Sequence, residues 1–335
     1  MTVRVDTDWT YRGLQAVILT NRQLRVVVLP ELGGKVWQVT DLRNGRELLW
    51  HNPRAAARRV EIGSTYDDVF FGGWDELFPN DEPEQLAGEP YPDHGELWTA
   101  AWDWHADDQG RIVLSTRTPI SACHFTKTIA LAEDEPRLQI SWRIHNQGLV
   151  ELPYLWKQHV AVPTDEPATV SMGARTVYLE DFGHPRAGSP GTEYTWPYLV
   201  EDGVRHDMRP TLPREARAAE FQYATELDAG WCAVTYADGS GIGLAFDPNV
   251  FPSCWTFASY GGWRAHEVLI LEPCTGYPIS VNQGVAAGTH RTLPADGVVE
   301  TTLTMVAYQG MAEVTGVALD GTVSGGRTEV ASDAN

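Results

Sequence analysis

The sequence contains few cysteines, and their spacing excludes the usual roles of cysteine pairs. Four are present in 335 residues, at Cys123, Cys232, Cys254 and Cys274. None stands in a CxxC pair or at a zinc-type spacing to histidine, and four are too few for a disulfide framework in so long a chain. The first nine residues also contain no apolar segment typical of a secretory signal. We therefore expect buried free thiols in a cytoplasmic protein.

Long hydrophobic runs and an excess of positive charge are both missing. No uninterrupted apolar run approaches the roughly 20 residues that a membrane helix needs. Lysine and arginine number 25 against 45 aspartate and glutamate residues, which leaves a net charge of −20. Nucleic acid and anionic membranes would be repelled by such a surface, so neither is expected as a partner. A hydrophobic fraction of 43%, in contrast, excludes a largely disordered chain.

Helical periodicity is scarce, and a period of two dominates instead. Residues 214–227, after Pro213, could hold one helix, but their apolar stripe is thin. Alternation of apolar and polar residues predicts strands in several places. The apolar positions are clearest at Leu138, Ile140, Trp142 and Ile144, and again at Leu303, Met305 and Ala307. Short apolar runs at Arg25–Leu29 and Lys35–Thr40 add two further strands.

Turn signals join several of these predicted strands into hairpins. Asn44-Gly45 follows the strand at Lys35–Thr40, and Asp238-Gly-Ser-Gly241 separates Trp231–Tyr236 from Ile242–Phe246. Many short strands with few helices predict an all-β antiparallel sandwich or barrel. We find no repeat of fixed period and no linker, so we expect one domain over residues 1–323, followed by a polar tail at residues 324–335.

Three segments combine titratable residues with glycine, proline and tryptophan. They are Phe70–Asn80 together with Pro92–Trp98, then Pro153–Val160, then Trp263–Pro278. Pyranose rings have apolar C–H faces and hydroxyl rims, so proteins hold them with flat aromatic surfaces and a few hydrogen-bonding groups. Glu272 follows the apolar run Val268–Leu271, and a carboxylate in such a run has either a partner or a function, because an unpaired buried charge is costly. A lone histidine in a β core is more often structural than catalytic.

In this order, the segments resemble the signature regions of the aldose 1-epimerase (galactose mutarotase-like) family. Asp93-His94-Gly95 resembles the first His-Gly motif of the family, and the Gly-Gly-Trp to Pro-Asn stretch resembles the loop before it. His159 resembles the second histidine, and Leu271-Glu272-Pro273 resembles the strand with the catalytic glutamate. The resemblance covers roughly residues 15 to 310. It implies a large antiparallel β-sandwich, the galactose mutarotase-like supersandwich.

The resemblance also implies a reaction: the interconversion of the two anomers of an aldose. A base removes the C1 hydroxyl proton while an acid protonates the ring oxygen, the ring opens, and it closes again on the other face. By similarity Glu272 would be the base and His159 the acid, and His94 would orient the sugar near its ring oxygen. Such a reaction needs no metal and no cofactor. We expect a small-molecule sugar as the partner and a monomer or a homodimer.

Further residues are candidates for sugar binding. They are Lys35, Trp74, Asn80, Glu96, Lys157 and Trp263. The two tryptophans stand next to glycine pairs that let a ligand approach. Lys157 would share the strand face of His159 because side chains alternate, Glu96 lies two residues after His94, and Asn80 ends the loop motif.

The chain departs from the family where many hexose mutarotases carry an arginine. Asp81 follows Asn80 here, and Glu96-Leu97-Trp98 replaces the usual aromatic-Ala-Arg after His-Gly. The missing guanidinium removes a bidentate donor to sugar oxygens. We therefore expect an outlying branch that acts on a modified, oxidised or deoxy sugar, with Lys35, Lys157 or Arg264 as the replacement cation.

Other functions are compatible with the same residues. A non-catalytic sugar-binding or sensor protein would keep the cleft without using an acid and a base. His94, His159 and Glu272 are also a legitimate metal-ligand set, although the His-x-His pattern of cupin-like barrels is missing. A carbohydrate lyase or hydrolase is a further alternative, and a hydrolase would normally need a pair of carboxylates flanking the scissile bond.

Overall fold

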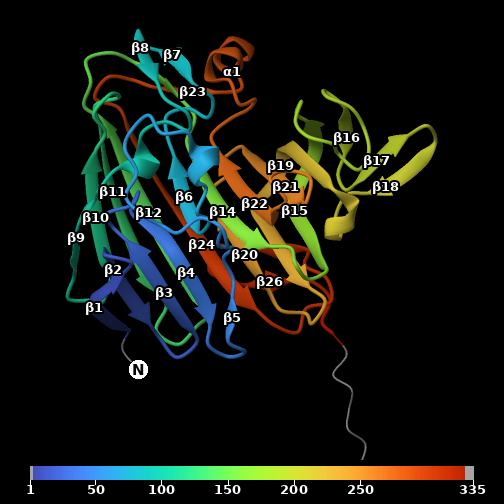
Figure 1. The fold of residues 1–335 in the computed structure, drawn as a ribbon, viewed down its shortest axis with the longest axis horizontal. Helices are drawn as coiled ribbons and strands as arrows, with labels where there is room; N and C mark the ends of the chain where they lie inside the picture. Colours follow the sequence, from blue (N-terminus) through green and yellow to red (C-terminus); the bar gives the residue numbers. More distant parts are fainter. Residues whose placement is uncertain (1–2, 329–335) are drawn as a thin grey trace, which may run out of the picture.

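One antiparallel sheet folds back on itself to form the body of the molecule. The computed structural model describes residues 3–328 (Figure 1). The first half of the sheet contains, in spatial order, β9 (Asp103–Ala106), β10 (Ile112–Arg117), β11 (Cys123–Leu131), β12 (Arg137–Asn146), β24 (Val298–Tyr308) and β20 (Gly241–Phe246). The second half contains β1 (Arg4–Tyr11), β2 (Leu14–Thr20), β3 (Leu24–Leu29), β4 (Lys35–Asp41), β6 (Trp74–Leu77), β14 (Lys157–Pro163), β22 (Glu267–Cys274) and β21 (Ser253–Tyr260).

Two long strands join the halves. The first residues of β19 (Ala218–Tyr236) pair with β21, and its last residues pair with β20. β15 (Ala168–Leu179) runs beside β19 along both parts, with an irregular register between Met172 and Ala174. The sheet can therefore turn from one layer into the other without ending. The all-β antiparallel sandwich predicted from the sequence is confirmed.

The apolar residues of the alternating sequence pattern pack into the core between the layers. In β12 the side chains of Leu138, Ile140, Trp142 and Ile144 are all buried, and they belong to one large apolar cluster with residues of the opposite layer. The predicted turns are present as well. β4 pairs with β5 (Arg46–Glu47) across Asn44-Gly45, and β19 pairs with β20 across residues 237–240.

The helix expected at residues 214–227 is wrong. A single turn of 3₁₀ helix, η3 (Arg214–Ala216), is followed directly by β19. Residues 218–225 are all buried; β21 pairs with residues 218–224, and β15 pairs with residues 222–225 on the other side. Pairing with two neighbours decided the conformation of a segment whose own periodicity was weak.

Short elements complete the fold around the two halves of the sheet. They are η1 (Tyr66–Val69), β7 (Glu84–Leu86), β8 (Glu89–Tyr91), η2 (Leu97–Thr99), β13 (Leu152–Tyr154), β16 (Glu193–Thr195), β17 (Tyr198–Glu201), β18 (Val204–Asp207), α1 (Val281–Ala287), β23 (Arg291–Leu293), β25 (Gly316–Val317) and β26 (Val323–Ser324). Figure 1 shows β7, β8, β23 and α1 together at one end, and β16 to β18 projecting beside it.

The predicted boundary at residue 323 falls inside a hairpin. Val323 and Ser324 pair with Gly316–Val317, and the Thr328 N–H donates to the Gly310 carbonyl. Residues 324–328 thus pack on the sandwich, and the rest of the predicted tail, residues 329–335, lies outside the described residues. All four cysteines are buried and unpaired, as expected. Among residues 3–328 no helix is long and apolar enough to span a bilayer.

Candidate active site

A row of side chains crosses one face of the second layer, and strand register brings it together. His159 of β14 lies opposite Asp75 of β6, and Trp255 of β21 lies opposite Glu272 of β22. The pairing of β14 with β22 places Glu272 opposite His159. Directly opposed residues of antiparallel strands have their Cβ atoms about 4.5–5.5 Å apart. The imidazole and the carboxylate predicted to be catalytic are therefore immediate neighbours on adjacent strands.

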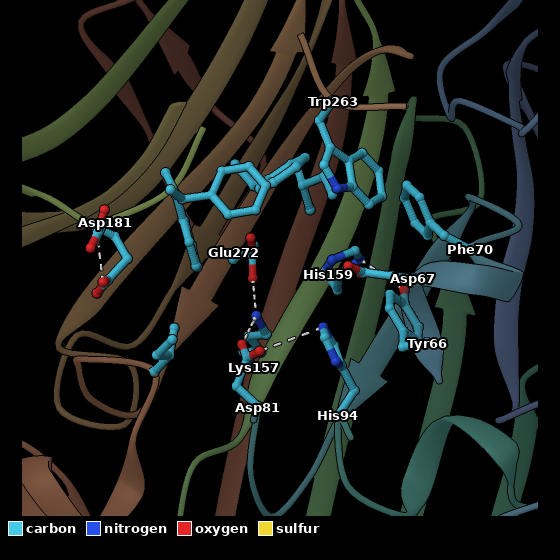
Figure 2. A pocket seen from close by; sticks show the side chains of 16 residues that line it. Tyr66, Asp67, Phe70, Asp81, His94, Lys157, His159, Asp181, Trp263 and Glu272 are labelled. Atoms are coloured by element: carbon cyan, nitrogen blue, oxygen red, sulfur yellow. Dashed lines mark hydrogen bonds and ion pairs between the residues drawn. The ribbon is translucent and has the colours of Figure 1, made fainter. Parts of the chain in front are cut away.

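This face forms the floor of a pocket of about 170 Å³ (Figure 2). Its polar residues are Tyr66, Asp67, Asp81, His94, Lys157, His159, Glu180, Asp181 and Glu272. Its apolar residues are Phe70, Phe182, Phe221, Phe257, Trp263, Ile270 and Ile279. The strands supply the floor, and η1 and the loop of residues 78–96 supply one wall.

Lys157 links the two buried carboxylates of the pocket. Its Nζ lies 2.5 Å from Oδ2 of Asp81 and 2.5 Å from Oε2 of Glu272. Burial would raise the pKa of Asp81, but the charges of Lys157 and His94 outweigh it and hold that pKa below its usual value. For Glu272, burial is the larger effect, and its pKa is raised despite the Lys157 ammonium. Glu272 thus retains more affinity for a proton than Asp81 does.

His94 is surrounded by carboxylates. Its Nδ1 lies 2.9 Å from Oδ1 of Asp93, its Nε2 lies 3.5 Å from Oδ1 of Asp81, and its ring stacks on Tyr66 with the centroids 4.3 Å apart. Burial would lower the pKa of His94, but Asp81 and Asp93 outweigh it, so the pKa is raised. Of the two histidines in the pocket, His94 is therefore the one that carries a proton more readily at neutral pH.

The loop that presents His94 depends on close backbone packing. The His94 N–H donates to the Asp81 carbonyl at 2.6 Å, and the Glu96 N–H donates to the Phe78 carbonyl at 2.9 Å. Gly95 has φ +71°, and a Cβ there would lie 2.1 Å from the Phe78 carbonyl oxygen. Only glycine fits this position, which explains the Gly after His94.

Two residues that were predicted to bind the sugar, Asn80 and Glu96, instead hold this loop and the backbone next to it. The Asn80 amide donates to the carbonyls of Glu82 and Pro92, both at 2.7 Å, and its side chain is fully buried. The Glu96 carboxylate accepts hydrogen bonds from the backbone N–H groups of Ile120 and Ser121 at 2.8 and 2.9 Å. Neither lines the pocket, so both predictions are corrected to structural roles.

His159 has surroundings opposite to those of His94. It is buried, its Nδ1 lies 3.2 Å from the Tyr66 hydroxyl, and no carboxylate of the described residues hydrogen-bonds to its ring. Burial is the main reason that the pKa of His159 lies well below its usual value, and the positive charges of Lys157, His94 and Lys35 lower it further. His159 is therefore a neutral imidazole at pH 7.

Of the three cations considered as replacements for the missing arginine, only Lys157 lines the pocket. Lys35 lies behind it, ion-paired with Asp75 at 2.9 Å and donating to the Gly72 carbonyl at 2.8 Å. Arg264 is largely exposed and bonds to Asp68 at 2.8 Å. The prediction that Lys157 and His159 share a strand face is confirmed, whereas Lys35, predicted to bind the sugar, does not line the pocket.

The two tryptophans predicted to stack on sugar differ. Trp263 lines the pocket beside Phe70 and Phe257, with ring centroids 6.4 and 5.3 Å away. Trp74 is buried in the core between the layers, and its indole N–H donates to the Gln158 side chain at 2.9 Å. Trp74 is on the opposite face of β6 from Asp75, so it cannot contact a ligand in this pocket.

Much of the pocket wall was not predictable from the sequence. Tyr66 and Asp67 come from a segment without any motif, and Phe182 and Phe221 come from distant strands and loops. Asp81 was visible as the residue in the arginine position, yet its pairing with Lys157 needed the fold. Among residues 3–328 no three His, Cys, Asp or Glu side chains are grouped as ligands of one ion.

Comparison with known proteins identifies the fold. No family model matches the sequence. A galactose mutarotase-like protein from Lactobacillus casei ATCC 334 has a TM-score of 0.62 over 88% of this chain and 100% of its own, at 14% identity. One from Clostridium acetobutylicum has a TM-score of 0.63 over 92% of this chain and 99% of its own, at 12% identity. A galactose mutarotase related enzyme from Lactobacillus acidophilus has a TM-score of 0.61 over 90% and 100%, at 12% identity.

These similarities extend over nearly the whole chain. The expected galactose mutarotase-like sandwich fold is confirmed. The similarity is one of fold, and the chemistry of the site depends on its own residues.

Proposed function

We propose that the chain is a cofactor-free aldose 1-epimerase, a mutarotase that interconverts the anomers of a sugar by acid–base ring opening. The observation that carries the proposal is the position of Glu272 next to His159 on adjacent strands, with His94 in the same pocket and an aromatic wall around them. The galactose mutarotase-like fold of the chain supports the same class of reaction.

The reaction needs one group that accepts a proton and one that donates it. In the forward half, Glu272 takes the proton of the C1 hydroxyl, the bond between C1 and the ring oxygen breaks, and the ring oxygen receives a proton from an imidazolium. Rotation about the C1–C2 bond then presents the other face of the aldehyde. Ring closure returns both protons, so no net change in charge or oxidation state occurs.

The charges in the pocket favour His94 as the proton donor. The resemblance implied His159 for this role, but burial and three nearby cations disfavour a charged His159, whereas Asp81 and Asp93 stabilise a charged His94. We therefore assign the acid role to His94 and give His159 a hydrogen-bonding role toward the sugar.

The same charges bear on the substrate. Five carboxylate residues line the pocket, at Asp67, Asp81, Glu180, Asp181 and Glu272, and the single lysine is already paired with two of them. A phosphate or carboxylate on the sugar would find no free cation and several like charges. The proposed substrate is thus an uncharged or ammonium-bearing sugar rather than an acidic one, with its C–H face against Phe70 and Trp263.

Anomer exchange measured by NMR tests the proposal. Neutral hexoses, pentoses, deoxy sugars, amino sugars and uronates would be compared with wild type, Glu272→Gln and the control Glu300→Gln, which alters an exposed glutamate on β24. We expect acceleration for an uncharged or amino sugar, loss of about 10²-fold or more in Glu272→Gln, and no change in the control. Normal exchange in Glu272→Gln would refute the mechanism, and line broadening without exchange would favour the non-catalytic binding protein instead.

A further inference from the structure

We infer that Lys35, Asp75 and Tyr66 form a hydrogen-bonded chain that fixes the tautomer of His159, so that its Nε2 is a hydrogen-bond acceptor toward the bound sugar. The functional part of this inference rests on the proposed function, whereas the tautomer is a property of the protein alone. Of these three residues only Tyr66 lines the pocket, and all three act through His159, so they are positioning residues.

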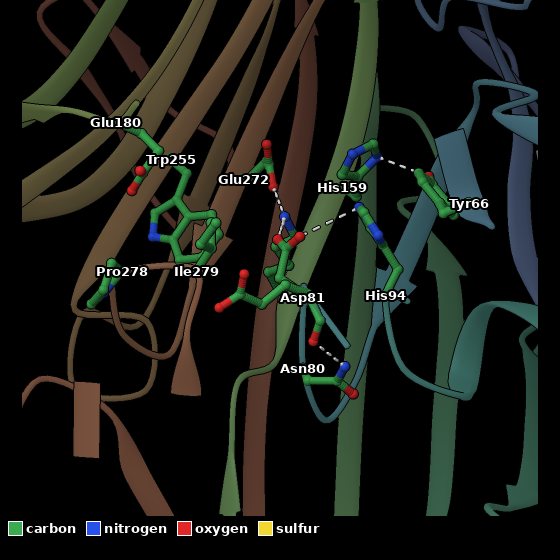
Figure 3. Close-up of polar contacts among 12 residues, drawn as sticks. Tyr66, Asn80, Asp81, His94, His159, Glu180, Trp255, Glu272, Pro278 and Ile279 are labelled. Atoms are coloured by element: carbon green, nitrogen blue, oxygen red, sulfur yellow. Dashed lines mark hydrogen bonds and ion pairs between the residues drawn. The ribbon is translucent and has the colours of Figure 1, made fainter. Parts of the chain in front are cut away.

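The chain runs from the core to the pocket through four side chains on four elements, and Figure 3 shows its last link, from Tyr66 to His159. Lys35 Nζ of β4 lies 2.9 Å from Oδ2 of Asp75 on β6. The same Oδ2 accepts a hydrogen bond from the Tyr66 hydroxyl of η1 at 2.7 Å. The Tyr66 oxygen in turn lies 3.2 Å from Nδ1 of His159 on β14. All four residues are buried, with exposed fractions of at most 4%.

The direction of each hydrogen bond follows from the charges. Asp75, paired with the Lys35 ammonium, is an acceptor, so the single proton of the Tyr66 hydroxyl points to Asp75. The Tyr66 oxygen then has only lone pairs to offer to His159. A favourable contact at Nδ1 therefore requires that Nδ1 carry a hydrogen and donate it.

A neutral imidazole with hydrogen on Nδ1 has a lone pair on Nε2. Within residues 3–328 no hydrogen bond joins Nε2 to another residue, and the ring edge opposite Nδ1 faces the side of the pocket on which Glu272 lies (Figure 3). His159 can therefore accept a hydrogen bond from a sugar hydroxyl, or its proton, but cannot donate one from Nε2. This property distinguishes it from His94.

The charged neighbours of His159 keep it in this form. They are Lys157 on its own strand, Lys35 from β4, His94 from the loop of residues 78–96, Glu272 from β22 and Asp75 from β6. The cations among them lower the pKa of His159, in addition to the effect of burial. Protonation of Nε2 is thus disfavoured while the hydrogen on Nδ1 is held by Tyr66.

Two-bond ¹⁵N–¹H NMR of histidine side chains measures the tautomer directly. The His159 signals would be identified by their absence in His159→Gln. In the wild type without ligand we expect a protonated Nδ1 and an unprotonated Nε2. Detection of hydrogen on Nε2 would overturn the inference.

Two variants break the chain at different links. The double variant Lys35→Met with Asp75→Leu replaces a buried ion pair by apolar side chains of similar size, which proteins often tolerate. The Tyr66 hydroxyl then loses its acceptor and can donate to Nδ1, so His159 should change to the form with hydrogen on Nε2. Tyr66→Phe removes the acceptor of Nδ1 and should give a mixture of both forms. Asp75→Asn keeps an acceptor oxygen and should retain the wild-type tautomer.

Tyr308→Phe is the matched control. It also removes a buried hydroxyl, one that lies 2.8 Å from both Thr235 and the Val234 carbonyl in a separate apolar cluster. We expect the tautomer of His159 to be unchanged in this variant.

The rates of anomer exchange distinguish a specific effect on the His159 tautomer from a general loss of folded structure. A wrong tautomer of a catalytic histidine lowers kcat by about 10⁴-fold in serine proteases, and we expect a loss of about 10²-fold or more in kcat for the double variant, with KM changed less. Retention of the wild-type tautomer in both the double variant and Tyr66→Phe would refute the inference. The predicted tautomers together with no exchange by the wild type would refute the proposed function alone.

Discussion

The two faces of the β6–β14 strand pair both bury a lysine against carboxylates, yet they do so in different ways. On the inner face, Lys127 of β11 reaches across the layers to Glu76, with Nζ 2.5 Å from Oε1 and 4.5 Å from the centroid of the Trp102 ring. On the pocket face, Lys157 lies between Asp81 and Glu272 and 4.6 Å from the Trp255 ring. The local chemistry is nearly the same.

The difference lies in the number of carboxylates and in what surrounds them. Glu76 has Lys127 as its cation and is enclosed by the core, so the pair can only stabilise or destabilise the fold. Lys157 has two carboxylates from separate elements, and the pocket lies beside them. Glu272 can therefore take a proton while Lys157 remains paired with Asp81, so the charge of the lysine stays compensated. A second carboxylate and an adjacent pocket turn a structural arrangement into one suited to proton transfer.

Removal of the inner lysine should have the largest effect. Lys127→Met leaves Glu76 buried without a cation, and breaking a buried pair in this way costs about 3–5 kcal/mol of unfolding free energy. Denaturant unfolding would measure the loss. The double variant Lys127→Met with Glu76→Leu should recover most of it, and a loss below about 1 kcal/mol in the single variant would show that the two faces do not differ as argued.

Removal of the pocket lysine should affect the reaction as well as the fold. In Lys157→Met the charges of Asp81 and Glu272 face each other uncompensated, which raises the pKa of Glu272 further. We expect anomer exchange to fall about 10²-fold at pH 7 and to recover partly as the pH rises and Glu272 ionises. Folded Lys127→Met, measured alongside, should exchange at nearly the wild-type rate. Equal losses in both variants would contradict the assignment of Lys157 to the site.

Glu47 is a buried carboxylate that accepts hydrogen bonds from backbone N–H groups and a threonine hydroxyl instead of a lysine. Its oxygens accept from the backbone N–H groups of Val39 and Leu49 at 2.9 and 3.2 Å, and burial raises its pKa to about 7. Since the pKa is higher in the folded state than in the unfolded state, the contribution of Glu47 to stability is fully present below about pH 4.5 and is lost as the pH rises to about 7. Between these two pH values, we expect the unfolding free energy of Glu47→Gln to fall by up to about 3 kcal/mol less than that of the wild type.

Urea unfolding at pH 4.5 and at pH 8 measures this effect. The difference in unfolding free energy between Glu47→Gln and wild type should increase with pH, in favour of the variant. If the difference in unfolding free energy is the same at both pH values, the pKa of Glu47 is not raised by burial, and its backbone hydrogen bonds stabilise the charged form as well as a lysine would.

The aromatic wall should give the smallest effect. Trp263→Ala removes one apolar surface of the pocket without touching its charges, and we expect KM for the sugar to rise about tenfold with kcat nearly unchanged, because such packing stabilises the ground state and the transition state alike. Trp74→Phe, a conservative change in the core, serves as the control and should leave KM unaltered. A fall in kcat for Trp263→Ala would assign that residue a part in the chemistry.

The strands with regular alternation were predictable from the sequence, and so were the hairpins at Asn44-Gly45 and Asp238–Gly241, because side-chain period and turn chemistry are local properties. The segment at 214–227 was not, since its pairing with β15 and β21 overrode a weak helical pattern. Glu272 and Trp263 were recognisable from their local context, since one follows an apolar run and the other a glycine pair. Lys157 was a candidate because it shares the strand face of His159, whereas His94 and His159 were candidates because of the resemblance to the aldose 1-epimerase family. Trp74, Asn80, Glu96 and Lys35 stand in equally distinctive contexts but point away from the pocket or hold its walls.

The sequence by itself thus determined the fold class, several of the residues that line the pocket and the absence of an arginine after Asn80. The tertiary structure alone decided which of those residues meet, because strand register brings His159 next to Glu272 and Asp75. It also decided their charges, because the pKa of an imidazole depends on the groups around it. Asp81 and Asp93 raise the pKa of His94 despite its burial, whereas burial and the charges of Lys157, His94 and Lys35 lower that of His159.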